Sequence, residues 1–568
     1  MDQTKILNDN TVGYIIYPES FKDSNDDGIG DLPGIISKLD YLRELGVNLL
    51  WICPIFKSPM VDNGYDVSDY YEINPRFGTM DDFKRLIQEA HNRGIKIVID
   101  FVLNHTSDQH PWFKKALEDP NSKERNYYIF RKGKMVDGKL VPPNNWASFF
   151  TDSVWEQVPN TDEFYFHAFS EKMPDVNWDN PELREEYYKI ADFYINLGVD
   201  GFRLDAAAHL AKDMSFSDSP LPVGIHGTVL DTSKFSNRPE NITYLKDLKE
   251  YGIKGRPCLL IGEVGGSVQP NEGRLLADRE NGVINLLFNF DTVWNNGNFG
   301  SIGKRDDEIK TDVIQLKHNF MRWYDACHDT CDMPLYWCNH DHPRVVSQYG
   351  SLKYRNESAK MLLTTLLFLY GTPFMLYGDE IGMSNLVKGT LDDFSLDVGT
   401  RNDIPLYRAL GYTDEQILTT LRRTSRLNGR TTMQWNRGPY AGFSDHKPIM
   451  PLNDDYLEGV DIQDEMEDPY SILNFFQYAI QMRKDPQIAR DVLYGKLDII
   501  DYNHPDVLAY RHEGSQNLMV ISSFRPYTTY FTFYYQIADV LLHNYDGVKI
   551  QDHVFELRPF ESLLLKLR

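Results

Sequence analysis

One pattern of apolar and polar residues recurs along the chain: an amphipathic helix, a glycine, and then a short apolar run. In the clearest case a helix capped by Thr79 ends at Gly94, and the apolar run Ile95–Phe101 follows. A second helix, predicted over 33–45, precedes the run Val47–Ile52. Such alternation of helices and strands is typical of α/β proteins with a parallel sheet.

Eight short apolar runs are candidates for strands. They are apolar at nearly every position rather than at alternate positions, so we expect strands that are buried on both faces. Eight strands in one chain favour a closed (β/α)8 TIM barrel over an open doubly wound sheet, and no glycine-rich phosphate-binding fingerprint follows the first strand. The eight runs are Val12–Tyr17, Val47–Ile52, Ile95–Phe101, Gly201–Leu204, Cys258–Gly262, Val283–Phe288, Leu335–Trp337 and Phe374–Tyr377.

Two long stretches and the C-terminal tail do not follow this alternation of helices and strands. A long segment, 105–177, follows the third strand, and a second insertion, at about 382–437, follows the eighth; segments of that length are usually functional insertions or small subdomains. In the tail, apolar residues alternate with polar ones, which predicts antiparallel strands. We therefore expect a barrel over 1–104 and 178–494, an inserted domain over 105–177, and a β domain over 495–568.

Charge and cysteine usage restrict the partners of the protein. The 59 Lys and Arg residues against 83 Asp and Glu give a formal net charge of −24, which argues against nucleic acid, anionic membrane surfaces and phosphate-rich substrates. Five scattered cysteines without a C-x-x-C pair indicate reduced thiols. The N-terminus has no apolar signal-peptide region, and the longest apolar stretch, Met361–Leu376, is too short for a membrane span. We expect a cytoplasmic protein that is a monomer or a weak homo-oligomer.

Chemistry-bearing residues gather where the predicted strands end. In barrels of this type the active site lies at the C-terminal ends of the strands. A single acid there could simply pair with a neighbouring cation, but three acids after the fourth, fifth and seventh strands are harder to explain structurally. Carboxylates held close together separate their pKa values into one nucleophile and one proton donor, as retaining glycoside hydrolysis requires. The residues concerned are Asp62, Tyr65, Asp100, Asn104, His105, Arg203, Asp205, Glu263, Asn339, His340 and Asp341.

Several of these segments resemble the signature regions of the α-amylase family, across nearly the whole chain. Finer features resemble its oligo-1,6-glucosidase and α-glucosidase group. The resemblance implies a catalytic barrel, a domain B over 105–177, and a C-terminal antiparallel β-sandwich. The family segments are DFVLNH (Asp100–His105), GFRLDAAAH (Gly201–His209), IGEVGG (Ile261–Gly266), NHDHPR (Asn339–Arg344) and MPDVNWDNP (Met173–Pro181); the group segments are NGYDVSDY (Asn63–Tyr70), PPNNWASFF (Pro142–Phe150) and RTTMQW (Arg430–Trp435).

The resemblance assigns a role to each site residue. Asp205 matches the nucleophile, Glu263 the general acid/base, and Asp341 the third carboxylate, which holds glucose hydroxyls. Arg203 would keep the nucleophile ionised. The remaining matches are substrate contacts: His105 and His340 as hydrogen-bond donors, Asp62 paired with Arg430 as a clamp behind the non-reducing glucose, Tyr65 as an aromatic platform and Phe169 as a wall from domain B. Such a blocked pocket implies exo-acting release of glucose from small oligosaccharides.

The loop Asp23–Asp31 (DSNDDGIGD) carries oxygen ligands at alternate positions. Asp23, Asn25, Asp27, the Ile29 carbonyl and Asp31 could surround a hard cation. In the resembled group this loop binds a structural Ca²⁺ or Mg²⁺, and no organic cofactor is implied. The alternative is an acidic turn without an ion.

Two positions near the site depart from the resembled group and leave the linkage open. Ala206 stands where α-1,6-specific relatives usually carry Val, and Met173 where they usually carry Gln. The expectation is therefore a retaining α-glucosidase acting on α-1,4 or α-1,6 bonds, or both. Two alternatives remain: a transglycosylase or isomerase such as trehalose synthase or sucrose isomerase, and a non-catalytic relative of the kind that carries a transmembrane helix.

Overall fold

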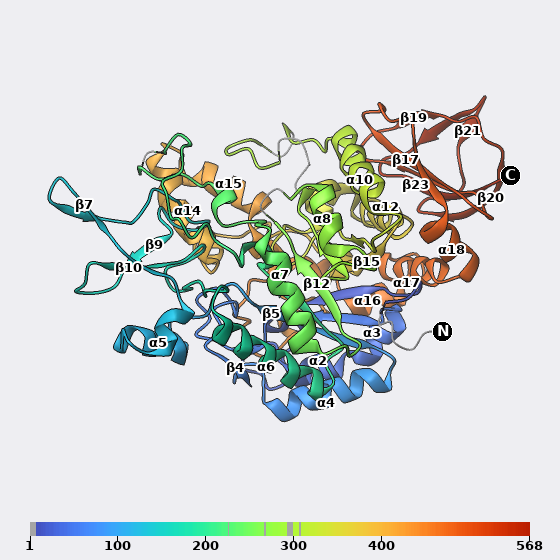
Figure 1. Cartoon of the computed structure of the whole chain (residues 1–568). Coiled ribbons are helices and arrows are strands. Elements are labelled where there is room, and N and C mark those ends of the chain that lie inside the picture. The colour runs from blue at the N-terminus through green and yellow to red at the C-terminus, as the bar shows by residue number, and fades with distance from the viewer. Residues whose placement is uncertain (1–6, 225, 266–267, 292–298, 306–307) are drawn as a thin grey trace.

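Eight strands form one parallel sheet at the centre of the computed structural model, in the order β13-β12-β11-β5-β2-β1-β15-β14 (Figure 1). The two strands at the ends of this order, β13 and β14, contact each other, so the sheet curls into a nearly closed barrel. The (β/α)8 barrel expected from the apolar runs is thus confirmed, and each run overlaps one strand. Their bounds are β1 Gly13–Ile16, β2 Leu49–Ile52, β5 Lys96–Val102, β11 Gly201–Asp205, β12 Leu259–Glu263, β13 Leu286–Phe288, β14 Pro334–Leu335 and β15 Thr372–Leu376. The structure describes residues 7–224, 226–265, 268–291, 299–305 and 308–568.

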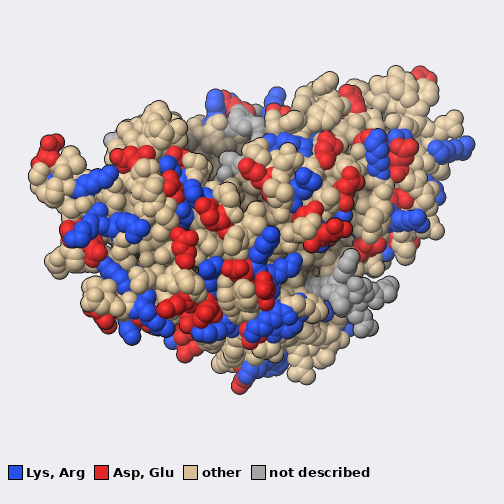
Figure 2. Space-filling model, viewed as in Figure 1, with Lys and Arg blue, Asp and Glu red and all other residues tan. Residues whose placement is uncertain are grey.

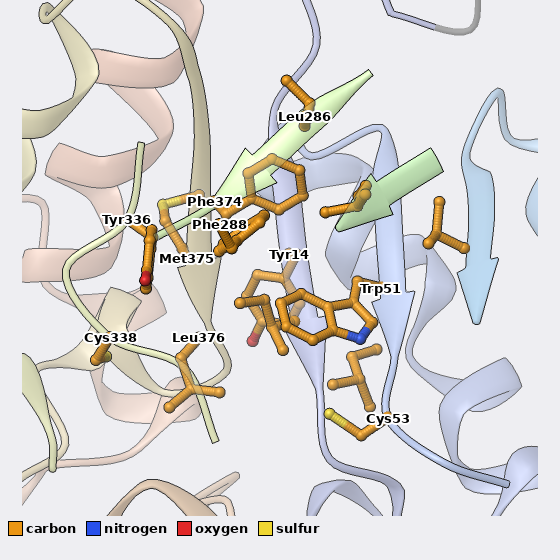
Figure 3. Close-up of a cluster of buried hydrophobic side chains, with 14 of the residues drawn as sticks. Tyr14, Trp51, Cys53, Leu286, Phe288, Tyr336, Cys338, Phe374, Met375 and Leu376 are labelled. Carbon is orange, nitrogen blue, oxygen red and sulfur yellow. The ribbon is translucent and has the colours of Figure 1, made fainter. Parts of the chain in front are cut away.

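Large aromatic side chains from several strands fill the inside of the barrel (Figure 3). Phe288 of β13 lies at their centre: its ring centroid is 5.5 Å from that of Trp51, 4.6 Å from Tyr336 and 5.1 Å from Phe374. All four side chains are buried. The barrel interior is therefore a packed core rather than a channel. A cavity that could hold a ligand must then lie at an end of the barrel.

Local sequence determines where the surrounding helices begin and end. Thr79 and Asp82 form a capping box at the start of α4 (Met80–Asn92). The helix predicted over 33–45 is wrong as a single element, because the chain forms α2 (Leu32–Ser37) and α3 (Leu39–Leu45). Lys38 between them leaves the helical conformation and places its ammonium group 4.0 Å from the centre of the Trp435 ring. Further helices around the barrel are α6 Pro181–Leu197, α7 Glu240–Asp247, α8 Pro270–Ala277, α10 Val313–Cys327, α12 Arg355–Leu367, α17 Ile472–Arg483 and α18 Pro486–Tyr494.

The segment between β5 and α6 forms a small antiparallel sheet beside the barrel mouth. Its strands are β6 (Phe130–Lys132), β9 (Trp155–Gln157) and β10 (Glu163–Phe166), and the hairpin β7–β8 (134–141) projects from it (Figure 1). Its buried core also takes in two side chains from the chain after β11, Phe216 and Phe235. The core of the inserted sheet is therefore completed by residues that follow β11.

The two longest helices of the insertion after β15, α14 (Val398–Ala409) and α15 (Asp414–Thr424), lie next to the inserted sheet (Figure 1). Contact between the two is direct, because the amide of Asn402 in α14 donates to the carbonyl of Phe150 at 3.1 Å. The barrel mouth is thus walled by two segments that are far apart in the sequence.

Two antiparallel sheets make up the C-terminal region, ordered β16-β17-β18-β23-β20 and β19-β22-β21. Apolar side chains from both sheets, such as Ile521 and Phe555, pack into one buried cluster, and α12 packs against β18 and β23. The strands are β16 Lys496–Ile500, β17 Val507–Glu513, β18 Leu518–Ser523, β19 Thr529–Thr532, β20 Ile537–His543, β21 Ile550–Gln551, β22 Val554–Leu557 and β23 Ser562–Leu567.

Acidic and basic side chains are interspersed over the face shown in Figure 2. In the described part of the chain, no helix has the length and apolar character needed to cross a membrane.

Candidate active site

Neighbouring strands place the proposed nucleophile and proton donor side by side. Asp205 is the last residue of β11 and Glu263 the last of β12, and the two strands are paired in parallel. Asp341 reaches the same place from the loop after β14. All three line one cavity of about 490 Å³ at the barrel mouth. The structure therefore brings together the three acids that the sequence singled out.

Arg203 is buried and contacts both Asp205 and Glu263. Its Nη1 donates to Asp100 at 2.9 Å and to Asp205 at 2.5 Å, and its Nη2 lies 2.9 Å from Glu263 Oε2. Burial raises the pKa of Asp205, Arg203 opposes this, and the negative charge of Glu263 adds to it. One guanidinium thus holds two acids that cannot both be ionised without repulsion, which suits a pair that exchanges one proton during a reaction.

The backbone after the nucleophile is held in an unusual conformation. Ala206 has φ of +49°, in the left-handed region that non-glycine residues rarely adopt. In this conformation its N–H donates to Glu263 Oε2 at 3.0 Å, which orients the proposed proton donor. Ala206 and Met173, the two candidates for linkage specificity, both line the cavity.

Asp341 is held as a carboxylate by three cationic or polar groups. It accepts from Arg430 at 2.7 Å and from Arg426 at 3.2 Å, and its other oxygen lies 3.1 Å from His340 Nε2. Burial alone would raise the pKa of Asp341, but His340, Arg430 and Arg426 together hold it well below its usual range. Asp341 is therefore suited to accept hydrogen bonds rather than to donate a proton.

The expected pairing of Asp62 with Arg430 is wrong. Asp62 is paired with Arg426 at 2.8 Å, whereas Arg430 is fully buried and donates to Asp341 and to the His340 carbonyl. Both arginines lie in the 3₁₀ helix Arg426–Arg430 and both reach Asp341, but at three residues per turn their separation of four positions offsets them by a third of a turn around the helix. Only Arg426 reaches the cavity. The motif RTTMQW drew attention to Arg430 because Arg426 lies just outside it.

The two histidines expected to donate to substrate occupy different positions. His105 lines the cavity, and within the described part of the chain its buried Nε2 has no hydrogen-bond partner. Burial lowers the pKa of His105, so the neutral ring can exchange a hydrogen bond with a sugar hydroxyl. His340 is fully buried outside the lining and its Nε2 already contacts Asp341 and Tyr65. It positions these two residues instead of facing the cavity.

Aromatic side chains form the apolar part of the lining. Tyr65 stacks on His340, with ring centroids 5.4 Å apart, and its hydroxyl donates to Asp100 at 3.2 Å. On the side of the inserted sheet, Phe169 stacks on Phe149 at 5.2 Å. Sequence reasoning assigned Tyr65 and Phe169 but gave no role to many other lining residues, among them Phe149, Phe150, His209, Asp397 and Arg426. The first three lie inside the quoted segments, so position relative to a motif could have suggested them.

The Asp23–Asp31 loop is organised by its own side chains. Asp23 accepts from the backbone N–H groups of Asn25 and Gly28 at 2.9 and 2.7 Å, and Asp27 accepts from Ile29 at 2.9 Å. Asp31 accepts from Gly34 and caps α2. The oxygen-only donor set suits a hard cation, yet among the described residues no three acidic, His or Cys side chains converge as metal ligands. A cation in this loop stays a prediction.

Comparisons with known proteins agree with this geometry. A family model for the catalytic domain of alpha amylase matches residues 15–491. The oligo-1,6-glucosidase of Bacillus cereus is 38% identical over 568 residues, which cover 98% of this chain and 99% of that protein. The solved trehalose-6-phosphate hydrolase of Bacillus licheniformis has a TM-score of 0.88 at 32% identity, covering 98% of this chain and 99% of its own. The isomaltulose synthase of Klebsiella sp. LX3 has a TM-score of 0.89 at 33% identity and covers 99% of both chains.

Proposed function

Because this chain belongs to the α-amylase family and is a glycoside hydrolase, we propose that it is an exo-acting, retaining α-glucosidase. Its substrates are short α-glucosides, from which it releases glucose at the non-reducing end. The observation that carries this proposal is the guanidinium of Arg203, which holds Asp205 and Glu263 within 3 Å of it at the ends of adjacent strands.

The residues divide the work of a two-step displacement. Glu263 donates a proton to the glycosidic oxygen while a carboxylate oxygen of Asp205 attacks the anomeric carbon, so the aglycone leaves and a covalent glucosyl-enzyme forms. Glu263, now ionised, takes a proton from water, which attacks the same carbon and releases glucose with its original configuration. Arg203 donates to Asp205 and so favours its ionised form before the attack.

The buried end of the cavity suits the glucose that is transferred. Asp341, held as a carboxylate, accepts hydrogen bonds from sugar hydroxyls, and the unpartnered Nε2 of His105 offers a further contact. The ion pair between Asp62 and Arg426 is buried beside them. We infer that this ion pair closes the cavity behind the non-reducing glucose and prevents a longer chain from passing through.

A second candidate is transfer of the glucosyl group to a sugar instead of to water. The observation that favours it is the apolar lining formed by Phe149, Phe150, Phe169 and Phe290, which keeps water away from the leaving-group side. The solved isomaltulose synthase shares the fold. A non-catalytic role has no support, since all three acids converge on one cavity.

Product analysis separates these functions. Purified protein is incubated with maltose, isomaltose, sucrose and trehalose, and the products are followed by NMR. Initial release of α-glucose from at least one disaccharide is expected. Initial β-glucose would overturn the retaining mechanism, and isomeric disaccharides formed without free glucose would favour the second candidate. The same series reads out the preference between α-1,4 and α-1,6 bonds.

We further propose that the protein is cytoplasmic, that it acts as a monomer or weak homo-oligomer, and that the Asp23–Asp31 loop holds a structural Ca²⁺ or Mg²⁺. All five cysteines are free, which is usual for a reducing compartment. The described lining already contains all three proposed catalytic acids, so the proposed reaction calls for no residue from a second copy. Cell fractionation and sedimentation analysis test the first two statements.

A further inference from the structure

One helix of the insertion after β15, α14, lines the cavity near its opening. Thr400, Asp403 and Tyr407 lie three and four positions apart along this helix, so they share one face, and all three line the cavity. The residues around the transferred glucose, such as Asp205 and His105, are buried, whereas Asp403 is exposed. In an exo-acting enzyme the aglycone lies toward the opening, and α14 therefore faces the aglycone.

The charge around this cavity is strongly one-sided. Arg426 is the one arginine or lysine among the described residues that line it. The acids of the lining are Asp62, Asp205, Glu263, Asp341, Asp397 and Asp403. The stretches 266–267, 292–298 and 306–307, which the structure does not describe, contain no arginine or lysine.

Arg426 is already paired with three carboxylates, so its single positive charge is more than balanced. Its Nε donates to Asp397 at 2.5 Å, its Nη1 to Asp341 at 3.2 Å and its Nη2 to Asp62 at 2.8 Å. Three of its five N–H donors thus serve carboxylates, whose summed negative charge exceeds the one positive charge of the guanidinium. A phosphate entering the cavity would meet uncompensated negative charge, which costs affinity in proportion to both charges.

Asp403 is the acid of the lining that is placed to act on the aglycone. In the described part of the chain it has neither an ion-pair partner nor a hydrogen-bond partner, and it lies at the opening. The other acids of the lining either belong to the reaction or are held by Arg203, Arg426 or Arg430. Asp403 is therefore free to bind an aglycone hydroxyl or amino group.

We propose that the aglycone side of this cavity selects substrates by charge, and that Asp403 determines the selection. Neutral and aminated aglycones are accepted, and phosphorylated aglycones are rejected. This inference rests on the proposed α-glucosidase function and extends it to the substrate class. It also separates this chain from the trehalose-6-phosphate hydrolase that shares its fold. The reaction that supplies the substrate must then deliver the disaccharide without phosphorylating it.

Three ligands that differ only at the aglycone test the proposal. They are maltose, its analogue with glucosamine at the reducing end, and its analogue with glucose 6-phosphate at the reducing end. We expect kcat/KM for the phosphorylated analogue to be at least 100-fold below that for maltose, and kcat/KM for the aminated analogue to equal or exceed it. Hydrolysis of the phosphorylated analogue within threefold of maltose would overturn the charge selection.

Variants at Asp403 test the assignment to this residue. One carboxylate acting on a doubly charged phosphate about 6 Å away through water-like surroundings changes binding about tenfold. Asp403→Asn should therefore raise the ratio of phosphorylated to neutral kcat/KM about tenfold, and Asp403→Lys should raise it further. Glu415→Gln, an exposed acid of α15 outside the cavity lining, is the matched control and should leave the ratio unchanged. An unchanged ratio in both Asp403 variants would refute the assignment.

The two levels of the proposal fail in different ways. If neither these maltose ligands nor isomaltose is hydrolysed, the α-glucosidase function fails. Titration calorimetry then measures the Kd of each of the three ligands for the unmodified protein and for both Asp403 variants. Charge selection stands if the phosphorylated ligand alone binds weakly, and it falls if all three bind equally.

Discussion

Replacing Arg426 by Gln tests whether one shared cation stabilises the three carboxylates around it. The side chain is 19% exposed and contacts three carboxylates, of Asp62, Asp341 and Asp397. Gln keeps part of the length but removes the charge, and the three acids then lie close together without their shared cation. Removing one partner of a buried ion pair typically costs about 3–5 kcal/mol because the other charge stays buried.

The loss should appear in both stability and activity. With an unfolding entropy of about 2.1 cal/mol/K per residue, a loss of about 3–5 kcal/mol lowers Tm by about 3–4 °C if the chain unfolds as one unit. Displacement of Asp62 and Asp341 by about 1 Å should lower kcat/KM about 100-fold or more. The control is Arg437→Gln, which removes an exposed arginine from a pair with Asp464 and should cost less than about 1 kcal/mol.

The pH dependence of this loss has a defined sign. Although burial opposes it, the pKa values of Asp341 and Asp397 lie below their usual range, partly because of Arg426. Carboxyl groups with lowered pKa values stabilise the fold above the unfolded-state pKa of about 4, and this contribution is lost as the pH falls through the folded-state value. Arg426→Gln removes one of the cations that lower both pKa values, so both rise relative to wild type, and protonation relieves the repulsion at a higher pH than in wild type. The Tm difference between wild type and Arg426→Gln should therefore be largest at pH 7 and smaller at pH 5. A Tm difference below 1 °C at pH 7, or one that grows toward pH 5, would refute this reasoning.

Four further predictions concern single residues of the site and of the loop. Asp205→Asn should lower kcat by a factor of about 10³ or more while circular dichroism and Tm stay close to wild type; activity within tenfold of wild type would remove the nucleophile assignment. Ala206→Val should lower Tm by about 1–2 °C, because a β-branched residue is strained at positive φ, and should change the ratio of isomaltose to maltose kcat/KM by at most about 200-fold. Met173→Gln, without that strain, should change the ratio alone. Adding Ca²⁺ at about 100 times its Kd to chelator-treated protein should raise Tm by about 2 °C, and an Asp27→Ala variant that still shows the full rise would place the ion elsewhere.

The barrel and the convergence of the proposed catalytic acids could be predicted from the sequence because each depends on local signals. A strand buried on both faces needs apolar residues at consecutive positions, and its last residue is readable as soon as the run ends. Asp205 and Glu263 are such last residues, and parallel pairing brings them together without further information. The same reasoning placed the cap of α4 at Thr79.

Contacts between distant segments could not be predicted in this way. Arg426 and Arg430 are equally basic and four residues apart, and which of them meets Asp62 depends on the direction of a short 3₁₀ helix. The core of the inserted sheet likewise includes Phe216 and Phe235, which lie outside the segment that forms the sheet. The break at Lys38 has the same origin, since its partner Trp435 lies almost four hundred residues away. Each case needs a partner that only the folded chain supplies.

In the proposed mechanism, strand-end residues and residues from the insertions lie on different sides of the cavity. The glucose side is built from strand ends that a barrel core holds rigidly, with Asp205, Glu263 and Arg203 fixed by paired backbone. The aglycone side is built from insertions: Phe149 from the inserted sheet and Asp403 from α14. Insertions tolerate substitution far better than strand ends do. A trehalose-6-phosphate hydrolase and an isomaltulose synthase share this fold. We therefore expect the cavities of such proteins to differ mainly in the residues on the aglycone side. Exchanging α14 between such proteins should change which aglycone is accepted while the nucleophile and proton donor continue to act on the same glucose.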